Sequence, residues 1–175
     1  MTDTATSSSA RRLGPPDAVA LASLRSSALE SSPLAFSSSA QDDPARSLDF
    51  LRESLGAANQ AVFGAFASEL IGMVGVYRDG HAKAAHRCEL WGLFVGAEHR
   101  RRGVGRALMA EAIAFARSLP GVTHLYLGVT DAAPQAMALY ERLGFITWGV
   151  DPASLCVDGR LVAEHHMVLA LGPSA

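Results

Sequence analysis

Residues 89–108 decide the fold, and they read Glu-Leu-Trp-Gly-Leu-Phe-Val-Gly-Ala-Glu-His-Arg-Arg-Arg-Gly-Val-Gly-Arg-Ala-Leu. The run 90–95 is apolar at both parities, with Trp91, Leu93 and Val95 at one and Leu90 and Phe94 at the other. Apolar residues at both parities predict burial on both faces, and hence a central strand. A short polar turn follows, and the segment 100–106 then runs into a helical pattern. A strand, a basic glycine-containing loop and a helix N-terminus in this order predict a binding site for a phosphorylated ligand.

The expected phosphate site has a local physical basis. The first turn of a helix leaves backbone N–H groups without partners at the positive end of the helix dipole. Gly103 and Gly105 lack a Cβ, so phosphate oxygens can approach the backbone closely. Four arginines within residues 100–106 add positive charge to a chain whose formal net charge is −2. The alternative is a solvated arginine cluster beside an ordinary glycine turn.

Two common phosphate-binding motifs are excluded. A Walker A loop ends in Gly-Lys followed by Ser or Thr, and the only lysine of this chain is Lys83. A dinucleotide-binding fingerprint needs a third glycine or an alanine where Leu108 stands. It also needs an acidic residue about 20 positions later, and residues 121–130 contain none.

Composition bounds the class of protein. A chain of 175 residues with 49% hydrophobic and 18% charged residues is expected to form one globular domain over residues 13–172, preceded by a flexible tail or weak first strand over residues 1–12. The near-neutral charge gives no reason to expect a nucleic-acid partner. Two distant cysteines, the absence of a signal peptide and the absence of an 18-residue apolar run predict a cytoplasmic protein with reduced thiols and no membrane partner. Adjacent histidines, His165 and His166, point to opposite faces of a strand, so no metal site is expected.

Hydrophobic periodicity and turn residues predict the element order (β)ααβββαβαββ, a mixed sheet with helices on both faces. Helices are expected from Pro15 to about residue 31, from Pro44 to Leu55, from the Arg/Gly loop to Pro120, and from Thr130 to Gly144. Strands are expected over 61–67, 71–77, 85–95, 124–130, 145–150 and 163–171, and an irregular segment with a turn at Asp158-Gly159 joins the last two. The serine-rich segment 31–47 is expected to be a long loop that is either functional or a flexible connector.

Three sequence features together resemble the GCN5-related N-acetyltransferase (GNAT) family. They are Arg100-x-x-Gly103-x-Gly105, the strand 89–95, and the segment 136–145, which follows the pattern A-x-x-L-Y-x-x-L-G-F. The resemblance covers residues 60–150 and implies a three-layer α/β (α+β) fold. Its mixed, mostly antiparallel sheet has six to seven strands, and the fourth and fifth strands splay apart.

The same resemblance implies acetyl-CoA as the co-substrate, with no metal. Pantetheine would pair with the backbone of 93–95, and the pyrophosphate would lie on the amides of 101–106. The residues expected to bind acetyl-CoA are Leu93, Phe94, Val95, Arg100, Arg101, Arg102, Gly103, Val104, Gly105, Arg106, Ala133, Ala136 and Tyr140. Ala133 stands where the family commonly has asparagine, so one side-chain contact to the donor is lost.

Direct transfer to an amine in a ternary complex needs a base and an acid. A lysine-like amine is neutral in only about one molecule in a thousand near pH 7.4, a shortfall of about 4 kcal/mol. The resemblance implies Glu89 as the candidate base, since many family members place a carboxylate at the start of this strand; the alternative is a salt-bridged surface glutamate. Tyr140 fits the position of the family's tyrosine acid and is the candidate acid for the leaving thiolate, with a core aromatic as the alternative. Gly128 occupies the position at which ribosomal-protein-type members often carry a carboxylate.

The acceptor is expected to be an amine-bearing small molecule or peptide, bound by the 31–47 loop, the start of the second helix and residues 150–162. Phe36 and Trp91 are the acceptor-site candidates. Other functions that fit the sequence are a non-catalytic acyl-CoA sensor and an acyltransferase that uses a longer acyl chain or a hydroxyl acceptor. The protein is expected to be a monomer or a homodimer.

Overall fold

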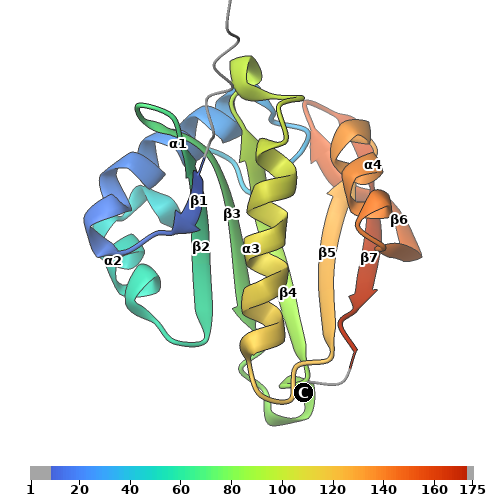
Figure 1. Cartoon of the computed structure of the whole chain (residues 1–175). Helices are drawn as coiled ribbons and strands as arrows, with labels where there is room; N and C mark the ends of the chain where they lie inside the picture. The colour runs from blue at the N-terminus through green and yellow to red at the C-terminus, as the bar shows by residue number, and fades with distance from the viewer. Residues whose placement is uncertain (1–8, 173–175) are drawn as a thin grey trace, which may run out of the picture.

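Seven strands form one sheet in the computed structural model, which describes residues 9–172 (Figure 1). Of the expected N-terminal tail or strand, residues 1–8 lie outside the described range, and residues 9–12 form the first strand. The strands are β1 Ser9–Arg12, β2 Gln60–Phe66, β3 Leu70–Arg78, β4 Arg87–Val95, β5 His124–Thr130, β6 Ile146–Val157 and β7 Arg160–Ala170. Their order across the sheet is β1-β2-β3-β4-β5-β7-β6. The predicted β4 is therefore the central strand.

Helices cover both faces of the sheet, as the sequence predicts (Figure 1). They are α1 Ala18–Ser31, α2 Leu48–Gly56, α3 Val104–Ser118 and α4 Pro134–Arg142. Leu21 and Leu51 pack in one core cluster on the α1 and α2 side, and Leu108 and Met109 pack in a larger cluster on the α3 and α4 side. Three layers with one core on each side of the sheet result. No helix within residues 9–172 is long and apolar enough to cross a membrane.

The second helix begins later than predicted. Pro44 opens a separate 3-10 turn, Pro44–Arg46, whose Ala45 amide donates to Oδ1 of Asp43 at 2.9 Å. The α-helix begins only at Leu48, where the Ser47 hydroxyl caps the Phe50 amide at 3.2 Å. Two consecutive caps split what the apolar spacing predicts as one helix.

The segment 151–162, predicted to be irregular, is instead part of a long β6–β7 hairpin. Its turn at Asp158-Gly159 is in the predicted place, and both residues have positive φ, at 51° and 79°. Two register shifts interrupt the pairing, one between Thr147 and Gly149 and one between Asp151 and Leu155. Pro152 in the second irregularity is tolerated because β6 is the edge strand of the sheet. Gly149 and Pro152 interrupt the alternation of side chains along β6, so the sequence pattern does not predict a strand there.

A bulge in β4 changes the side-chain faces that the sequence predicts. Gly92 has a φ of 66°, and the register with β3 shifts between Met73 and Gly75. Trp91 therefore packs toward the α1 and α2 cluster, whereas Leu93 packs toward the α3 and α4 cluster. The predicted grouping of Trp91 with Leu93 was wrong, because the extra residue of a bulge reverses the alternation beyond it.

The parallel pair β4–β5 separates after three residues. Its pairs are Arg87 with His124, Cys88 with Leu125, and Glu89 with Tyr126. Beyond Glu89, β4 stays paired with β3 and β5 stays paired with β7, so the two strands diverge. The predicted splay is confirmed, and it leaves the β5-facing edge of β4 free for a ligand to pair with.

Candidate active site

A cavity of about 620 Å³ occupies the opening between β4 and β5. Its walls come from the α1–α2 loop, α2, both diverging strands and the first turns of α4, so it reaches both faces of the sheet. Among the residues predicted from the sequence, the cavity brings together Phe36, Trp91, Leu93, Ala133, Ala136 and Tyr140. Part of the predicted acceptor side and part of the predicted donor side therefore share one cavity, whereas its lining, among the described residues, does not include Phe94, Val95, residues 100–106 or the predicted acceptor segment 150–162.

The Arg/Gly loop connects the end of β4 to α3 with two left-handed residues. Arg101 has a φ of 61° and Gly103, the N-cap of α3, has a φ of 82°. The first backbone bond of the helix runs from the Ala107 amide to the Gly103 carbonyl at 3.0 Å. Within the described chain, the amides of 101–106 donate to no backbone carbonyl. The loop therefore presents a run of N–H groups at the positive end of the α3 dipole, as an anion site requires.

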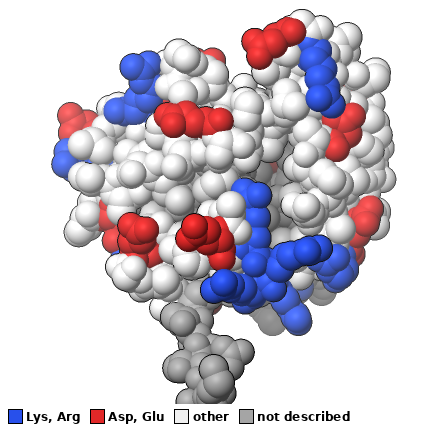
Figure 2. Space-filling model, turned by 90° about the horizontal axis from the view of Figure 1, so that it is seen from above, with Lys and Arg blue, Asp and Glu red and all other residues white. Residues whose placement is uncertain are grey.

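The four arginines of the loop do not share one role. Arg100 turns back, and its Nε donates to the Val95 carbonyl at 2.8 Å, which ties the loop to the end of β4. The side chains of Arg101, Arg102 and Arg106 belong to exposed residues. Figure 2 shows basic side chains gathered beside a furrow at this end of the molecule. A polyanionic ligand would meet a positive field there, although the whole chain is slightly acidic.

Tyr140 lies on α4 with only 7% of its surface exposed, and it lines the cavity. Its ring packs against Phe145, with 5.7 Å between the ring centroids. Burial raises the pKa of its hydroxyl above the ordinary value of 10.0, so the group stays protonated across the physiological range. The ring of Tyr140 is part of the core, and the residue also lines the cavity in which the acid would have to lie.

Glu89 lies at the last β4–β5 pair, at the closed end of the splay. Its Oε1 accepts a hydrogen bond from Nη2 of Arg87 at 2.6 Å, and the Arg87 guanidinium stacks over Tyr126 at 3.9 Å from the ring centroid. Tyr77, its partner on β3, lines the cavity, but Glu89 is outside the set of lining residues. Its contacts are those of a salt-bridged glutamate near the site.

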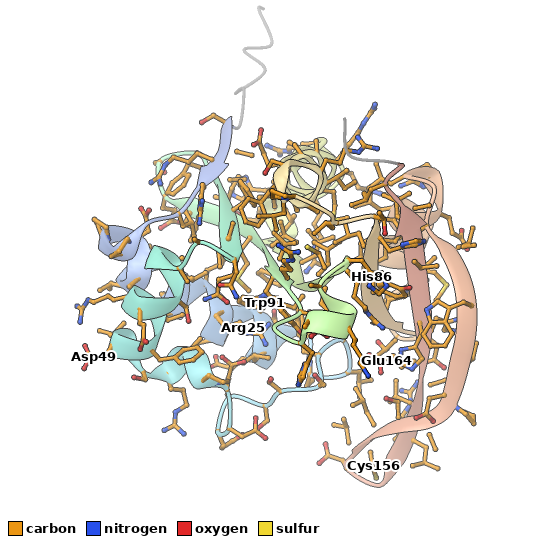
Figure 3. All side chains as sticks on the ribbon, turned by 90° about the horizontal axis from the view of Figure 1, so that it is seen from below. Arg25, Asp49, His86, Trp91, Cys156 and Glu164 are labelled. Atoms are coloured by element: carbon orange, nitrogen blue, oxygen red, sulfur yellow. The ribbon has the colours of Figure 1, made fainter. Side chains whose placement is uncertain are left out.

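The acceptor-side wall rests on a buried ion pair that the sequence did not reveal. Nη2 and Nε of Arg25, on α1, donate to Oδ2 of Asp43 at 2.7 and 3.0 Å. The Arg25 guanidinium lies 5.0 Å from the ring of Phe36 and 5.7 Å from that of Trp91. Figure 3 shows Arg25 and Trp91 together in the middle of the molecule. The pair holds the α1–α2 loop and both predicted acceptor-site aromatics in place.

Trp91 has room because Gly75 lies beneath it. A Cβ added to Gly75 would lie well inside 3.0 Å of three indole atoms, a distance that real Cβ atoms do not show. The indole therefore packs directly against the β3 backbone at Gly75. Gly75 gave no sign of this role in the sequence, because the contact depends on the β3–β4 register.

Glu164, on β7, is a further cavity-lining residue that the sequence did not reveal. Its Oε2 accepts a hydrogen bond from the Ser154 hydroxyl at 2.8 Å. No group of three or more His, Cys, Asp or Glu residues within 9–172 is placed to hold a metal ion.

Comparison with known proteins identifies the family. The model of the acetyltransferase (GNAT) family matches residues 21–145. The chain is 38% identical over 98 residues to human N-acetyltransferase 8 and 44% identical over 59 residues to streptothricin acetyltransferase of Streptomyces lavendulae. These matches cover 55% and 34% of the chain but span only 42% and 31% of the two relatives.

Solved structures match over nearly the whole chain. A GNAT-family acetyltransferase of Streptococcus pneumoniae superposes with a TM-score of 0.81 at 23% identity, covering 92% of this chain and 98% of that one. The yncA protein of Salmonella typhimurium, solved with its cofactor acetyl-CoA, also has a TM-score of 0.81, at 20% identity and 96% coverage of both chains. At these identities the structures establish the shared fold, and the family model establishes the lineage: the chain belongs to the GNAT acetyltransferase family.

Proposed function

We propose that this protein transfers the acetyl group of acetyl-CoA directly to a primary amine. Three observations carry the proposal: the donor loop at the N-terminus of α3, the edge of β4 that is unpaired with β5 beyond Glu89, and the cavity at this opening that Tyr140 lines. Family membership supports acetyl-CoA as the donor, because the Salmonella neighbour contains it as its cofactor.

The residues present fit this donor. The amides of 101–106 and the flanking arginines suit a pyrophosphate. The edge of β4 that faces the opening suits the amides of a pantetheine arm laid beside it as an extra strand, although the Val95 carbonyl already accepts the Arg100 hydrogen bond. Ala133 and Ala136 make the facing wall small and apolar. The missing asparagine at position 133 leaves this wall without a polar side chain.

Tyr140 supplies the proton donor in the proposed reaction. Its hydroxyl stays protonated, so it can donate to the sulfur on which negative charge develops as the thioester breaks. Glu89 stays the candidate base that its sequence position suggests, acting through water or through Tyr77. The hydrogen bond from Arg87 occupies one of its two oxygens.

The resemblance to named relatives does not identify the acceptor of this protein. Relatives carry names that refer to streptothricin, mycothiol and spermidine, which are chemically unlike one another. The proposal therefore extends only to the class of primary amines.

Thiol release from acetyl-CoA with a panel of primary amines, and mass spectrometry of the products, test the proposal. We expect turnover that depends on the amine and an amine product heavier by one acetyl group. Tight acetyl-CoA binding without turnover on any amine would contradict it and would favour a sensor.

A Tyr140→Phe variant tests the acid. We expect kcat to fall about 10- to 100-fold, the worth of one hydrogen bond to a charged group, with unchanged acetyl-CoA affinity. Tyr126→Phe, outside the set of cavity-lining residues, is the matched control. Wild-type kcat in Tyr140→Phe would remove the residue from the chemistry.

A further inference from the structure

Glu164 places a carboxylate over Gly128, just beyond the point at which β4 and β5 separate. A Cβ added to Gly128 would lie 2.8 Å from the Glu164 carboxyl carbon and closer still to its Oε1. Gly128 follows the last β4–β5 pair, Glu89 with Tyr126, by two residues on β5. The glycine thus leaves space for a carboxylate that reaches across from the neighbouring strand, β7.

The side of the sheet on which Glu164 lies is the acceptor side. Gly128 has the same parity as Thr130, whose hydroxyl donates to the Leu34 carbonyl in the α1–α2 loop at 2.8 Å. Figure 3 shows Glu164 on the β7 side of the space, with Trp91 and Arg25 toward the other side. A donor arm filling the opening as an extra strand would lie about 5 Å from β5. Its thioester would therefore come within reach of a carboxylate above Gly128, directly or through one water.

Among the carboxylates that line the cavity, Glu164 is the one with an oxygen that no other described residue bonds. Asp43, the other acid that lines the cavity, accepts both bonds from Arg25 and caps Ala45. Glu89 is outside the lining set and is paired with Arg87. Glu164 has no basic partner among the described salt bridges, and the Ser154 hydroxyl bonds only its Oε2. One oriented carboxylate with a free oxygen suits a single ammonium.

Four aromatic side chains contribute to the remaining acceptor side, beside the polar lining residues Arg25, Ser37, Ser38, Ser54 and Gln60. Phe50 and Tyr77 line the cavity while 47% and 40% of their surfaces are exposed, and Phe36 and Trp91 line it more deeply. Exposed aromatic surface beside a concave site favours a ligand with an apolar or aromatic body. A second ammonium would find no free carboxylate among the lining residues.

We propose that Glu164, in place of Glu89, binds the acceptor ammonium and serves as the base, and that the acceptor is a monoamine with an apolar or aromatic body. This inference rests on the proposed acetyltransferase function. The Glu164 carboxylate takes one proton from the ammonium, directly or through water. The nitrogen lone pair then forms the C–N bond to the acetyl carbonyl carbon, and the C–S bond breaks. Tyr140 donates a proton to the sulfur, the attacking nitrogen loses one further proton to the Tyr140 oxygen to give the neutral amide, and the proton on Glu164 passes to solvent.

The steric relation between positions 128 and 164 gives a specific test. Glu164→Gln removes the base but keeps the shape, and we expect kcat/KM for phenethylamine to fall at least 100-fold, the lower end for general base catalysis. Gly128→Ala pushes a flexible carboxylate aside, so it should cause a similar loss while the midpoint of urea unfolding and the KM for acetyl-CoA stay at wild-type values. Glu69→Gln, an exposed residue in the β2–β3 turn, is the matched control.

A relocation variant separates chemistry from structure. Gly128→Glu combined with Glu164→Ala moves the carboxylate to β5, into the space that the natural side chain vacates. We expect it to recover at least tenfold in kcat/KM over Glu164→Ala alone. Near wild-type kcat/KM in Glu164→Gln, or no recovery in the relocation variant, would overturn the role of Glu164.

An amine comparison tests the inferred acceptor class. We expect phenethylamine and hexylamine to exceed spermidine and ethanolamine at least tenfold in kcat/KM for the wild type. Equal or better use of spermidine would overturn the substrate class. Turnover of none of the amines by the wild type would instead contradict the proposed function itself, so the two failures are distinguishable.

Discussion

Gly103→Ala perturbs the donor loop at one backbone angle. Gly103 has a φ of 82°, and no atom lies within 4 Å of an added Cβ, so the change is free of steric overlap. An alanine in the left-handed region costs about 1–2 kcal/mol. The protein can bear this cost in its stability, or the loop can relax and turn its amides away from the pyrophosphate.

The loss of stability and the loss of acetyl-CoA affinity both come from the same conformational cost of alanine at position 103. The sum of the two losses can therefore be predicted. If the loop relaxes, its binding-competent conformation becomes the minor one, and the apparent Kd rises by the same factor. A cost of 1–2 kcal/mol corresponds to about 5- to 30-fold in Kd. We therefore expect the loss of unfolding free energy and the loss of acetyl-CoA binding free energy together to total about 1–2 kcal/mol.

Gly121→Ala is the matched control, because Gly121 also has a positive φ, of 77°, and no atom lies within 4 Å of its added Cβ. Gly121 follows the C-terminal end of α3, the end opposite the donor loop. Its alanine variant should lose about 1–2 kcal/mol of unfolding free energy and keep the wild-type Kd for acetyl-CoA. Isothermal titration with acetyl-CoA and urea unfolding measure both terms for each variant. Gly103→Ala with wild-type Kd and wild-type stability would refute the assigned loop geometry.

Three further predictions concern other parts of the fold. Gly75→Ala should cost about 1–3 kcal/mol in urea unfolding, because Trp91 must leave its place, and Trp91→Ala should remove most of that cost. Burial raises the pKa of Cys88 to about 11, so at pH 8 a thiol reagent should label Cys156 quickly and Cys88 only after unfolding; rapid labelling of both would contradict its burial. The hydrogen bonds that Asp17 accepts from Arg11 and from the Gly14 amide lower its pKa, so Asp17→Asn should cost about 1 kcal/mol near pH 7. That cost should vanish as the pH falls through the lowered pKa, and a pH-independent cost would contradict the assignment.

Local sequence features predicted the parts of the fold that local features determine. The order of helices and strands, the position of the Arg/Gly loop before α3 and the turn at Asp158-Gly159 each depend on residues close in sequence. The bulge at Gly92 and the long β6 strand were not predictable in this way. A bulge is defined by two residues facing one, and the tolerance of Pro152 depends on β6 being an edge strand.

The acceptor side was the least predictable because its parts meet only in the folded sheet. Arg25 and Asp43 lie 18 residues apart, and neither belongs to a motif. Glu164 comes from β7 but lies above Gly128 of β5, so a sequence reading sees a missing carboxylate at 128 and no replacement. The donor side is different, since Arg100 to Arg106 form it within one loop.

A single-turnover experiment tests the central proposal most directly. The protein, in excess over acetyl-CoA labelled with ¹⁴C in the acetyl carbonyl group, is quenched over time with and without phenethylamine. We predict that the label passes to the amine in one phase, and that without the amine it stays on CoA with none bound to the protein. Label that accumulates on the protein before reaching the amine, or that never leaves CoA with any amine, would contradict direct acetyl transfer in this cavity.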